Sequence, residues 1–173
     1  MSRLSVLMTV YNEAEFVDYA IRACLPYVDD LVIVEGAYQE TIALGASPRS
    51  TDGTLEILEQ WKDAAEKEGE DSIVHFIEAN EQTDKDQRNA GLEKIKELNP
   101  DGWVLIIDGD EVYDKNAFSM IRSAMVNMDR SQKLAAIFRS LTFVNDFKHF
   151  AEQDFPRLFK ILISRLTKFK FPK

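Results

Sequence analysis

Short apolar runs alternate with longer amphipathic stretches along the first two thirds of the chain. Each run is rich in Val, Ile and Leu and is bounded by polar or turn residues. This pattern is typical of strands that are buried on both faces of a parallel sheet. It predicts strands at residues 4–10, 31–34, 72–79 and 103–107.

Between these strands, apolar residues recur at the spacing of one helix face. Asn12 is placed to cap the first helix, and successive strand–helix–strand units predict right-handed crossovers. Residues 37–49 show neither the apolar run of a buried strand nor the spacing of a helix face. We interpret them as a loop of the length often found in functional lids. The spacing predicts helices over 16–25, 54–65, 85–98 and 115–128.

Past the last predicted helix, the pattern predicts strands over 134–144 and 155–163, separated by a polar segment over 145–154. Together the elements predict an α/β fold with a mostly parallel sheet flanked by helices. The length of 173 residues suits one domain over 1–173.

Composition narrows the function classes. The formal net charge of −9 argues against a nucleic-acid partner, which a basic surface would serve. The one cysteine, Cys24, cannot form an internal disulfide and fits a reducing compartment. The chain shows no signal peptide and no apolar run long enough to span a membrane, so we expect a cytoplasmic protein.

The last residues, 157–173, contain basic residues and no acidic ones. We favour a last sheet element with a solvated basic face, or a cut edge that normally packs on missing residues. The alternative is peripheral contact with an anionic membrane at its cytoplasmic face, which would bring the protein to a lipid-linked partner.

The segment Asp108-Gly109-Asp110 places acids directly after an apolar strand. In extended backbone both aspartates point the same way, and Gly109 lets the chain bend and a ligand approach closely. Two carboxylates on one side suit a divalent cation that also holds a diphosphate. A solvated Asp-Gly turn is the alternative interpretation.

Other strand ends also carry polar residues, namely Asn12-Glu13, Glu35 and the loop at Asn80. In a parallel sheet these ends share the edge with Asp108, and open α/β sheets bind ligands at that edge. Arg88 lies in the first turns of a predicted helix, where a cation is favourable only beside an anion. A bound anion and a surface pair with Asp84 both satisfy this condition.

Four segments, taken in order and spacing, resemble glycosyltransferase family 2, whose members have the GT-A nucleotide-sugar fold. They are residues 9–13, 50–54, 88–91 and 108–110, the last corresponding to the family's Asp-x-Asp motif. The resemblance implies metal-dependent transfer of a sugar, with inversion, from a nucleotide-diphosphate-sugar to a hydroxyl acceptor. A UDP-sugar is the favoured donor, and the acceptor is a glycan, a lipid-linked molecule or a protein.

The resemblance also implies roles for individual residues. Mn²⁺ or Mg²⁺ would be bound by Asp108 and Asp110, where it would bridge the diphosphate and stabilise the leaving nucleotide. Arg88 would lie near the diphosphate, and Glu35 stands where the family usually has an aspartate that binds the base. The implied nucleotide-binding residues are Thr9, Tyr11, Asn12, Glu13, Glu35, Asp52, Arg88 and Asp108.

The chain departs from the family pattern in three ways. Residues 37–49 stand between the acid of the second strand and Ser50-Thr51-Asp52, so we expect an altered base-binding wall. The Gln-x-x-Arg-Trp motif of processive members is absent. Most members are longer beyond the metal-binding strand, so we expect the acceptor-side segment 145–173 to be incomplete.

Inverting transfer needs a carboxylate that takes the proton of the acceptor hydroxyl. By position we expect this base in the polar segment, with Asp154 and Glu152 as the candidates and Asp146 as a third. Two other functions stay open: a metal-dependent nucleotidyltransferase, and a catalytically incomplete module that binds nucleotide-sugars and needs a partner chain. The first usually has a glycine-rich phosphate loop, which Tyr11-Asn12-Glu13 lacks.

Overall fold

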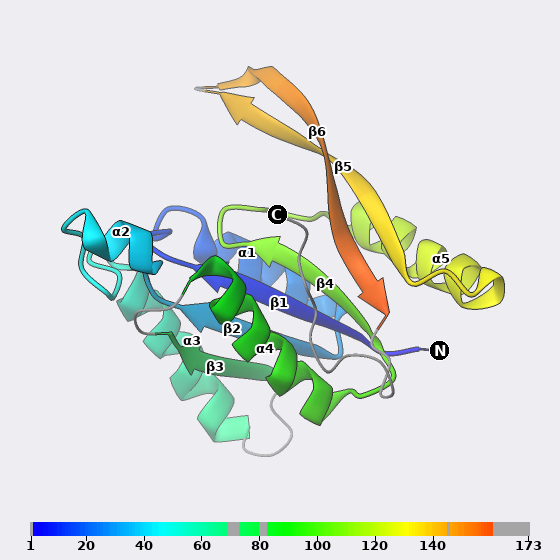
Figure 1. Cartoon of the computed structure of the whole chain (residues 1–173), viewed down its shortest axis with the longest axis horizontal. Coiled ribbons are helices and arrows are strands. Elements are labelled where there is room, and N and C mark those ends of the chain that lie inside the picture. Colours follow the sequence, from blue (N-terminus) through cyan, green and yellow to red (C-terminus); the bar gives the residue numbers. More distant parts are fainter. Residues whose placement is uncertain (1, 69–72, 80–82, 145, 161–173) are drawn as a thin grey trace.

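The computed structural model of the chain describes residues 2–68, 73–79, 83–144 and 146–160, with the backbone alone for 138–156, 159 and 160. It confirms the predicted α/β architecture, a six-stranded sheet in the order β3-β2-β1-β4-β6-β5 with helices on both faces (Figure 1). The strands are β1 (Leu4–Val10), β2 (Asp30–Glu35), β3 (Val74–Glu78), β4 (Trp103–Asp108), β5 (Ala135–Val144) and β6 (Asp146–Lys160); the helices are α1 (Val17–Cys24), α2 (Gln39–Ala43), α3 (Thr54–Glu68), α4 (Asp84–Leu98) and α5 (Lys115–Ser131).

The strands β1 to β4 all run parallel, with β1 paired to β2 on one side and to β4 on the other. Their carboxyl ends therefore lie along one edge of the sheet, as the sequence predicted. β6 runs antiparallel to β4, and β5 runs antiparallel to β6.

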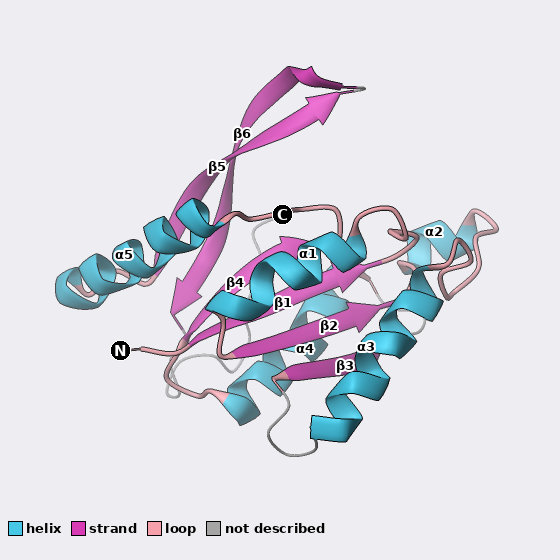
Figure 2. Cartoon of the chain, turned by 180° about the vertical axis from the view of Figure 1, so that it is seen from behind, coloured by secondary structure: helices cyan, strands magenta, loops and turns pink. Residues whose placement is uncertain are grey.

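The two faces of the sheet have separate cores. Alternate residues of β1, such as Leu4 and Met8, pack with residues of α1, α3 and α5. Leu7, which points the other way, packs with residues of α4. Figure 2 shows α1 and α3 on one face of the sheet and α4 behind it. Burial on both faces explains why β1, β2 and β4 read as continuous apolar runs.

Helix α4 approaches the sheet closely because it carries a glycine at the contact. A Cβ added to Gly91 would lie 2.1 Å from Leu7 Cδ1 and 3.0 Å from Val34 Cγ2. The helix begins at a conventional cap, since the Thr83 side chain accepts a hydrogen bond from the Asp86 backbone N–H at 3.2 Å. This contact fixes the first turn of α4 beside the carboxyl ends of β1 and β2.

Three local predictions differ from the structure. Residues 37–49 contain the short helix α2, and the strand predicted from residue 155 begins at Asp146, because β6 pairs with β5 along its length. Asn12 does not cap α1, whose N-cap is Phe16. Asn12 instead has a φ of 54°, a left-handed conformation that asparagine tolerates better than most residues.

The β5–β6 hairpin extends away from the rest of the sheet (Figure 1). Within the described residues, β6 pairs with β4 where Trp103, Val104 and Leu105 face Lys160, Phe159 and Leu158. None of the helices in the described ranges combines the length and apolarity that a membrane span requires. The loop at Asn80 and most of the basic C-terminal segment lie outside the described residues.

Candidate donor site at the carboxyl edge of the sheet

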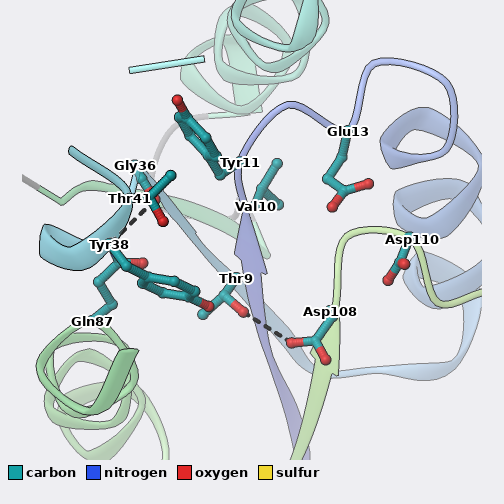
Figure 3. Close-up of a pocket in the computed structure, with 10 residues that line it drawn as sticks. All are labelled: Thr9, Val10, Tyr11, Glu13, Gly36, Tyr38, Thr41, Gln87, Asp108 and Asp110. Atoms are coloured by element: carbon teal, nitrogen blue, oxygen red, sulfur yellow. Dashed lines mark hydrogen bonds between the residues drawn. The ribbon is translucent and has the colours of Figure 1, made fainter. Parts of the chain in front are cut away.

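A cavity of about 350 Å³ opens at the carboxyl edge, between the ends of β1, β2 and β4 and the first turn of α4 (Figure 3). Predicted site residues and residues that the sequence did not single out share its lining. The predicted ones are Thr9, Tyr11, Glu13, Asp108 and Asp110, and the others are Val10, Gly36, Tyr38, Thr41 and Gln87.

Asp108 is held by hydrogen bonds at both carboxylate oxygens. Its Oδ1 accepts from Thr9 Oγ1 at 3.1 Å and from an Arg88 Nη at 3.0 Å. Its Oδ2 accepts from two Nη atoms of Arg157, each at 3.2 Å. Burial alone would raise the pKa of Asp108, but the charges of Arg88 and Arg157 outweigh it and hold this pKa below its usual value. Asp108 is therefore a paired carboxylate and not part of a solvated turn.

Of the two interpretations of Arg88, the structure shows the pair with Asp84, and a bound anion stays a prediction. The Arg88 Nε donates to Asp84 Oδ1 at 2.6 Å, which is the predicted pair within the helix. Its Nη reaches Asp108, so an anion does lie nearby, supplied by the protein itself. The Arg88 side chain is only 15% exposed, and Arg88 is not among the residues that line the cavity.

Asp110 and Glu13 face the same space from opposite loops (Figure 3). The pKa of Glu13 is raised to about 7, first by burial and then by the charges of Asp110, Asp108 and Asp52. The two loops approach closely at Gly109, where a Cβ would lie 3.1 Å from Glu13 Cγ. Among the described residues no cation pairs with Glu13 or Asp110, so this corner of the cavity holds uncompensated negative charge.

A divalent cation fits this donor set. No group of three acids, histidines or cysteines converges within the described part of the chain. Mg²⁺ sites that serve phosphate substrates commonly use one or two carboxylates and complete their shell with phosphate oxygens and water. Asp110 and Glu13 offer such carboxylates. The pKa of Glu13 is raised first by burial and then by the neighbouring acids, and a cation would offset this second contribution.

The loop after β1 is held in place by residues 50–54. Asn12 donates its backbone N–H to Ser50 Oγ at 2.9 Å and accepts from the Thr51 N–H at 2.8 Å. The Glu13 N–H donates to Thr54 Oγ1 at 2.8 Å. Asp52 accepts from the Ala14 N–H at 3.0 Å and so supports Glu13 from behind. Asn12 and Asp52 do not line the cavity, and their contact with a nucleotide stays a prediction.

Glu35 is buried at the end of β2, with 4% of its surface exposed. Its Oε1 accepts from the Ser50 N–H at 2.9 Å and from Ser50 Oγ at 2.8 Å, and its Oε2 forms an ion pair with Arg49. A base that binds Glu35 would have to replace one of these partners. The predicted role of Glu35 in base binding therefore stays a prediction.

The inserted residues 37–49 contribute to one wall of the cavity, and the expectation that this wall binds the base stays a prediction. Tyr38 and Thr41 line the cavity from this segment, and the side chain of Tyr38 lies beside Thr9. Gln87 donates from Nε2 to the Gly36 and Ala37 carbonyls at 3.1 and 3.0 Å. Sequence periodicity gives no signal for these contacts, because they join a helix to an irregular segment.

The predicted bases, Asp154 and Glu152, lie on β6 opposite Arg139 and Leu141 of β5. The structure describes only the backbone there, so their side chains, like those of Asp146 and His149, lie outside the described residues. Their assignment stays a prediction.

Solved structures with a similar fold come from a bacterial protein. The chain is similar to S. aureus TarS 1-349, with a TM-score of 0.51 and 18% identity, over 83% of this chain and 37% of that one. It is also similar to S. aureus TarS 1-349 in complex with UDP, with a TM-score of 0.53 and 17% identity, over 83% of this chain and 36% of that one. At this identity the likeness shows the fold alone, and the chain spans little more than a third of either structure. No curated protein matches the sequence.

The family model gives the assignment. The model of glycosyl transferase family 2 matches residues 5–171, which cover every strand and helix described above except Leu4, the first residue of β1. The chain therefore belongs to glycosyl transferase family 2 and has a GT-A-like fold.

Proposed function

We propose that this chain binds a nucleotide-diphosphate-sugar together with Mn²⁺ or Mg²⁺ and transfers the sugar to a hydroxyl acceptor. One observation carries the proposal: residues far apart in sequence line a single cavity at the carboxyl edge, with Thr9 and Glu13 beside Asp108 and Asp110. Open α/β sheets bind their ligands at this edge, and family membership gives the reaction class.

The cavity has an acidic part and an aromatic part. Its acidic corner, at Glu13 and Asp110, suits the cation, and Arg88 gives a positive charge for the diphosphate nearby. The aromatic wall formed by Tyr11 and Tyr38 suits the base and ribose. UDP is the nucleotide we favour, because the TarS domain of similar fold has been solved in complex with UDP.

In the proposed reaction the acceptor oxygen attacks the anomeric carbon from the side opposite the leaving group. The bond from that carbon to the diphosphate oxygen breaks, and the electron pair leaves with the nucleotide. A carboxylate takes the hydroxyl proton, for which Asp154 and Glu152 are our candidates. The cation, when bound, offsets the negative charge that develops on the diphosphate.

Labelled nucleotide-sugars test the proposal directly. The protein is incubated with each UDP-sugar and Mn²⁺, with and without simple glycan, lipid-linked or peptide acceptors. We expect release of UDP above the rate in EDTA, either by transfer or by slow hydrolysis. Tight UDP binding without any turnover would support a donor-binding module instead, and release of pyrophosphate would support a nucleotidyltransferase.

A further inference from the structure

Arg157 lies where the β5–β6 hairpin meets the acidic end of β4. It directly precedes Leu158, the first residue of β6 that pairs with β4, and its side chain is 11% exposed. Its guanidinium donates to Asp108 Oδ2 from two Nη atoms, each at 3.2 Å, and to Glu111 Oε1 at 2.6 Å. An arginine of the hairpin thus contacts the first aspartate of the Asp-Gly-Asp segment.

These contacts leave Asp108 with little capacity for a metal. A carboxylate oxygen has about two acceptor positions, and each oxygen of Asp108 already accepts two hydrogen bonds. The bonds from Arg157 to Asp108 are at the long end of the usual range, whereas its bond to Glu111 is short. Arg157 is therefore held by Glu111 as well as by Asp108, so it keeps an acidic partner when a cation displaces it from Asp108.

We propose that Arg157 is a positioning residue that competes with the divalent cation for Asp108. The proposal rests on the proposed function, because it needs the cation to bind at this edge. Without donor, Arg157 holds Asp108 in place and its positive charge weakens binding of the metal alone. With donor, the diphosphate supplies negative charge, and Arg157 moves from Asp108 while it keeps Glu111. Metal and nucleotide then bind more tightly together than separately, and this coupling is reciprocal.

The test is calorimetric titration of Mn²⁺ without nucleotide, and then of UDP with and without Mn²⁺. In Arg157→Gln we expect the affinity for Mn²⁺ alone to rise at least about fivefold, since a neighbouring positive charge that repels the ion is removed. We also expect Mn²⁺ to strengthen UDP binding by a smaller factor than in the wild type. Arg157→Lys keeps the charge and should bind Mn²⁺ within about twofold of the wild type, so a simple loss of packing is separated from a loss of charge.

Arg122→Gln is the matched control, since Arg122 also donates three hydrogen bonds, to Ser2, Tyr27 and Asp29 away from the cavity. Its affinity for Mn²⁺ should equal that of the wild type. An unchanged or weaker affinity of Arg157→Gln for Mn²⁺ would show that Arg157 is only a structural brace and would overturn the inference. A wild-type protein that binds neither Mn²⁺ nor UDP would overturn the proposed function as well, so the two failures are distinguishable.

Discussion

The acids around the cavity fall into two groups at the scale of single residues. Asp108 and Glu111 are balanced by arginines, whereas Glu13 and Asp110 have no cation partner among the described residues. The first group is fixed by the protein itself, and the second depends on what binds. We therefore expect Asp110 and Glu13 to be the carboxylates that the proposed cation affects most.

Glu13 gives a prediction for the pH dependence of stability in metal-free protein. Its pKa is about 7 in the folded state and 4.5 in the reference state, so between these values the folded chain binds protons more strongly than the unfolded chain. The free energy of unfolding therefore falls as pH rises through this range. Glu13→Gln removes this effect and should be more stable than the wild type at pH 8 by about 1 kcal/mol, after allowance for solvent screening, and similar near pH 4.5.

Urea unfolding in EDTA at several pH values measures this difference. Glu15→Gln, at an exposed position on the same loop, is the control and should follow the wild type. Identical pH slopes for Glu13→Gln and the wild type would show that Glu13 does not carry the proposed burden of negative charge.

At the scale of elements, the inserted segment 37–49 depends on contacts at its two ends. Gln87 binds the carbonyls at its start, and Tyr11 donates from its hydroxyl to the Ser47 carbonyl at 2.8 Å near its end. Arg49 then joins the segment to Glu35 of β2 and Glu78 of β3. The cavity wall is therefore attached to the sheet by specific polar contacts.

Arg49→Gln tests this attachment. It leaves Ser50 as the hydrogen-bond partner of the buried Glu35 carboxylate, so the free energy of unfolding should fall by roughly 2 kcal/mol. Lys62→Gln, which removes an exposed ion pair with Glu59 within α3, should change stability by less than about 0.5 kcal/mol. Equal effects of the two variants in chemical denaturation would refute the special role of Arg49.

Gly91→Ala tests the close contact between α4 and β1. Alanine favours a helix over glycine by about 1 kcal/mol, but its Cβ would overlap Leu7 in the closed core, at a typical cost of about 1–3 kcal/mol. We therefore expect the free energy of unfolding of Gly91→Ala not to rise, and to fall if the Leu7 side chain cannot move aside. The double variant with Leu7→Ala should lose less stability than the two single variants lose together, since the new Cβ no longer overlaps the Leu7 side chain. Additive losses in thermal unfolding would mean that the contact is not tight.

The sequence predicts the elements best where burial on both faces imposes the pattern, as in β1, β2 and β4. It misses the early start of β6, because polar residues from Asp146 onward become a strand through pairing with β5 and not through their own periodicity. It predicts Asp108 and Asp110 from their place after a strand. It cannot predict that Arg157 contacts Asp108, because this depends on the antiparallel register of β6 on β4.

At the scale of the whole molecule, the parallel arrangement of β1 to β4 brings distant segments to one edge. Four segments that are far apart in sequence surround one cavity or support its lining. They are residues 11–14, residues 50–54, the start of α4 and the end of β4. The hairpin joins this edge through Arg157. The topology of the sheet therefore creates the proposed donor site.

The most direct test of the account compares UDP affinity with and without Mn²⁺ for the wild type, Asp110→Ala and Asp101→Ala, an acid in an exposed turn. We predict that Mn²⁺ strengthens UDP binding at least about tenfold in the wild type and in Asp101→Ala. In Asp110→Ala, an exposed position where folding should be intact, this gain should disappear. If Asp110→Ala binds UDP with the full gain from Mn²⁺, the acids at this edge do not hold a cation for the diphosphate and the account is contradicted.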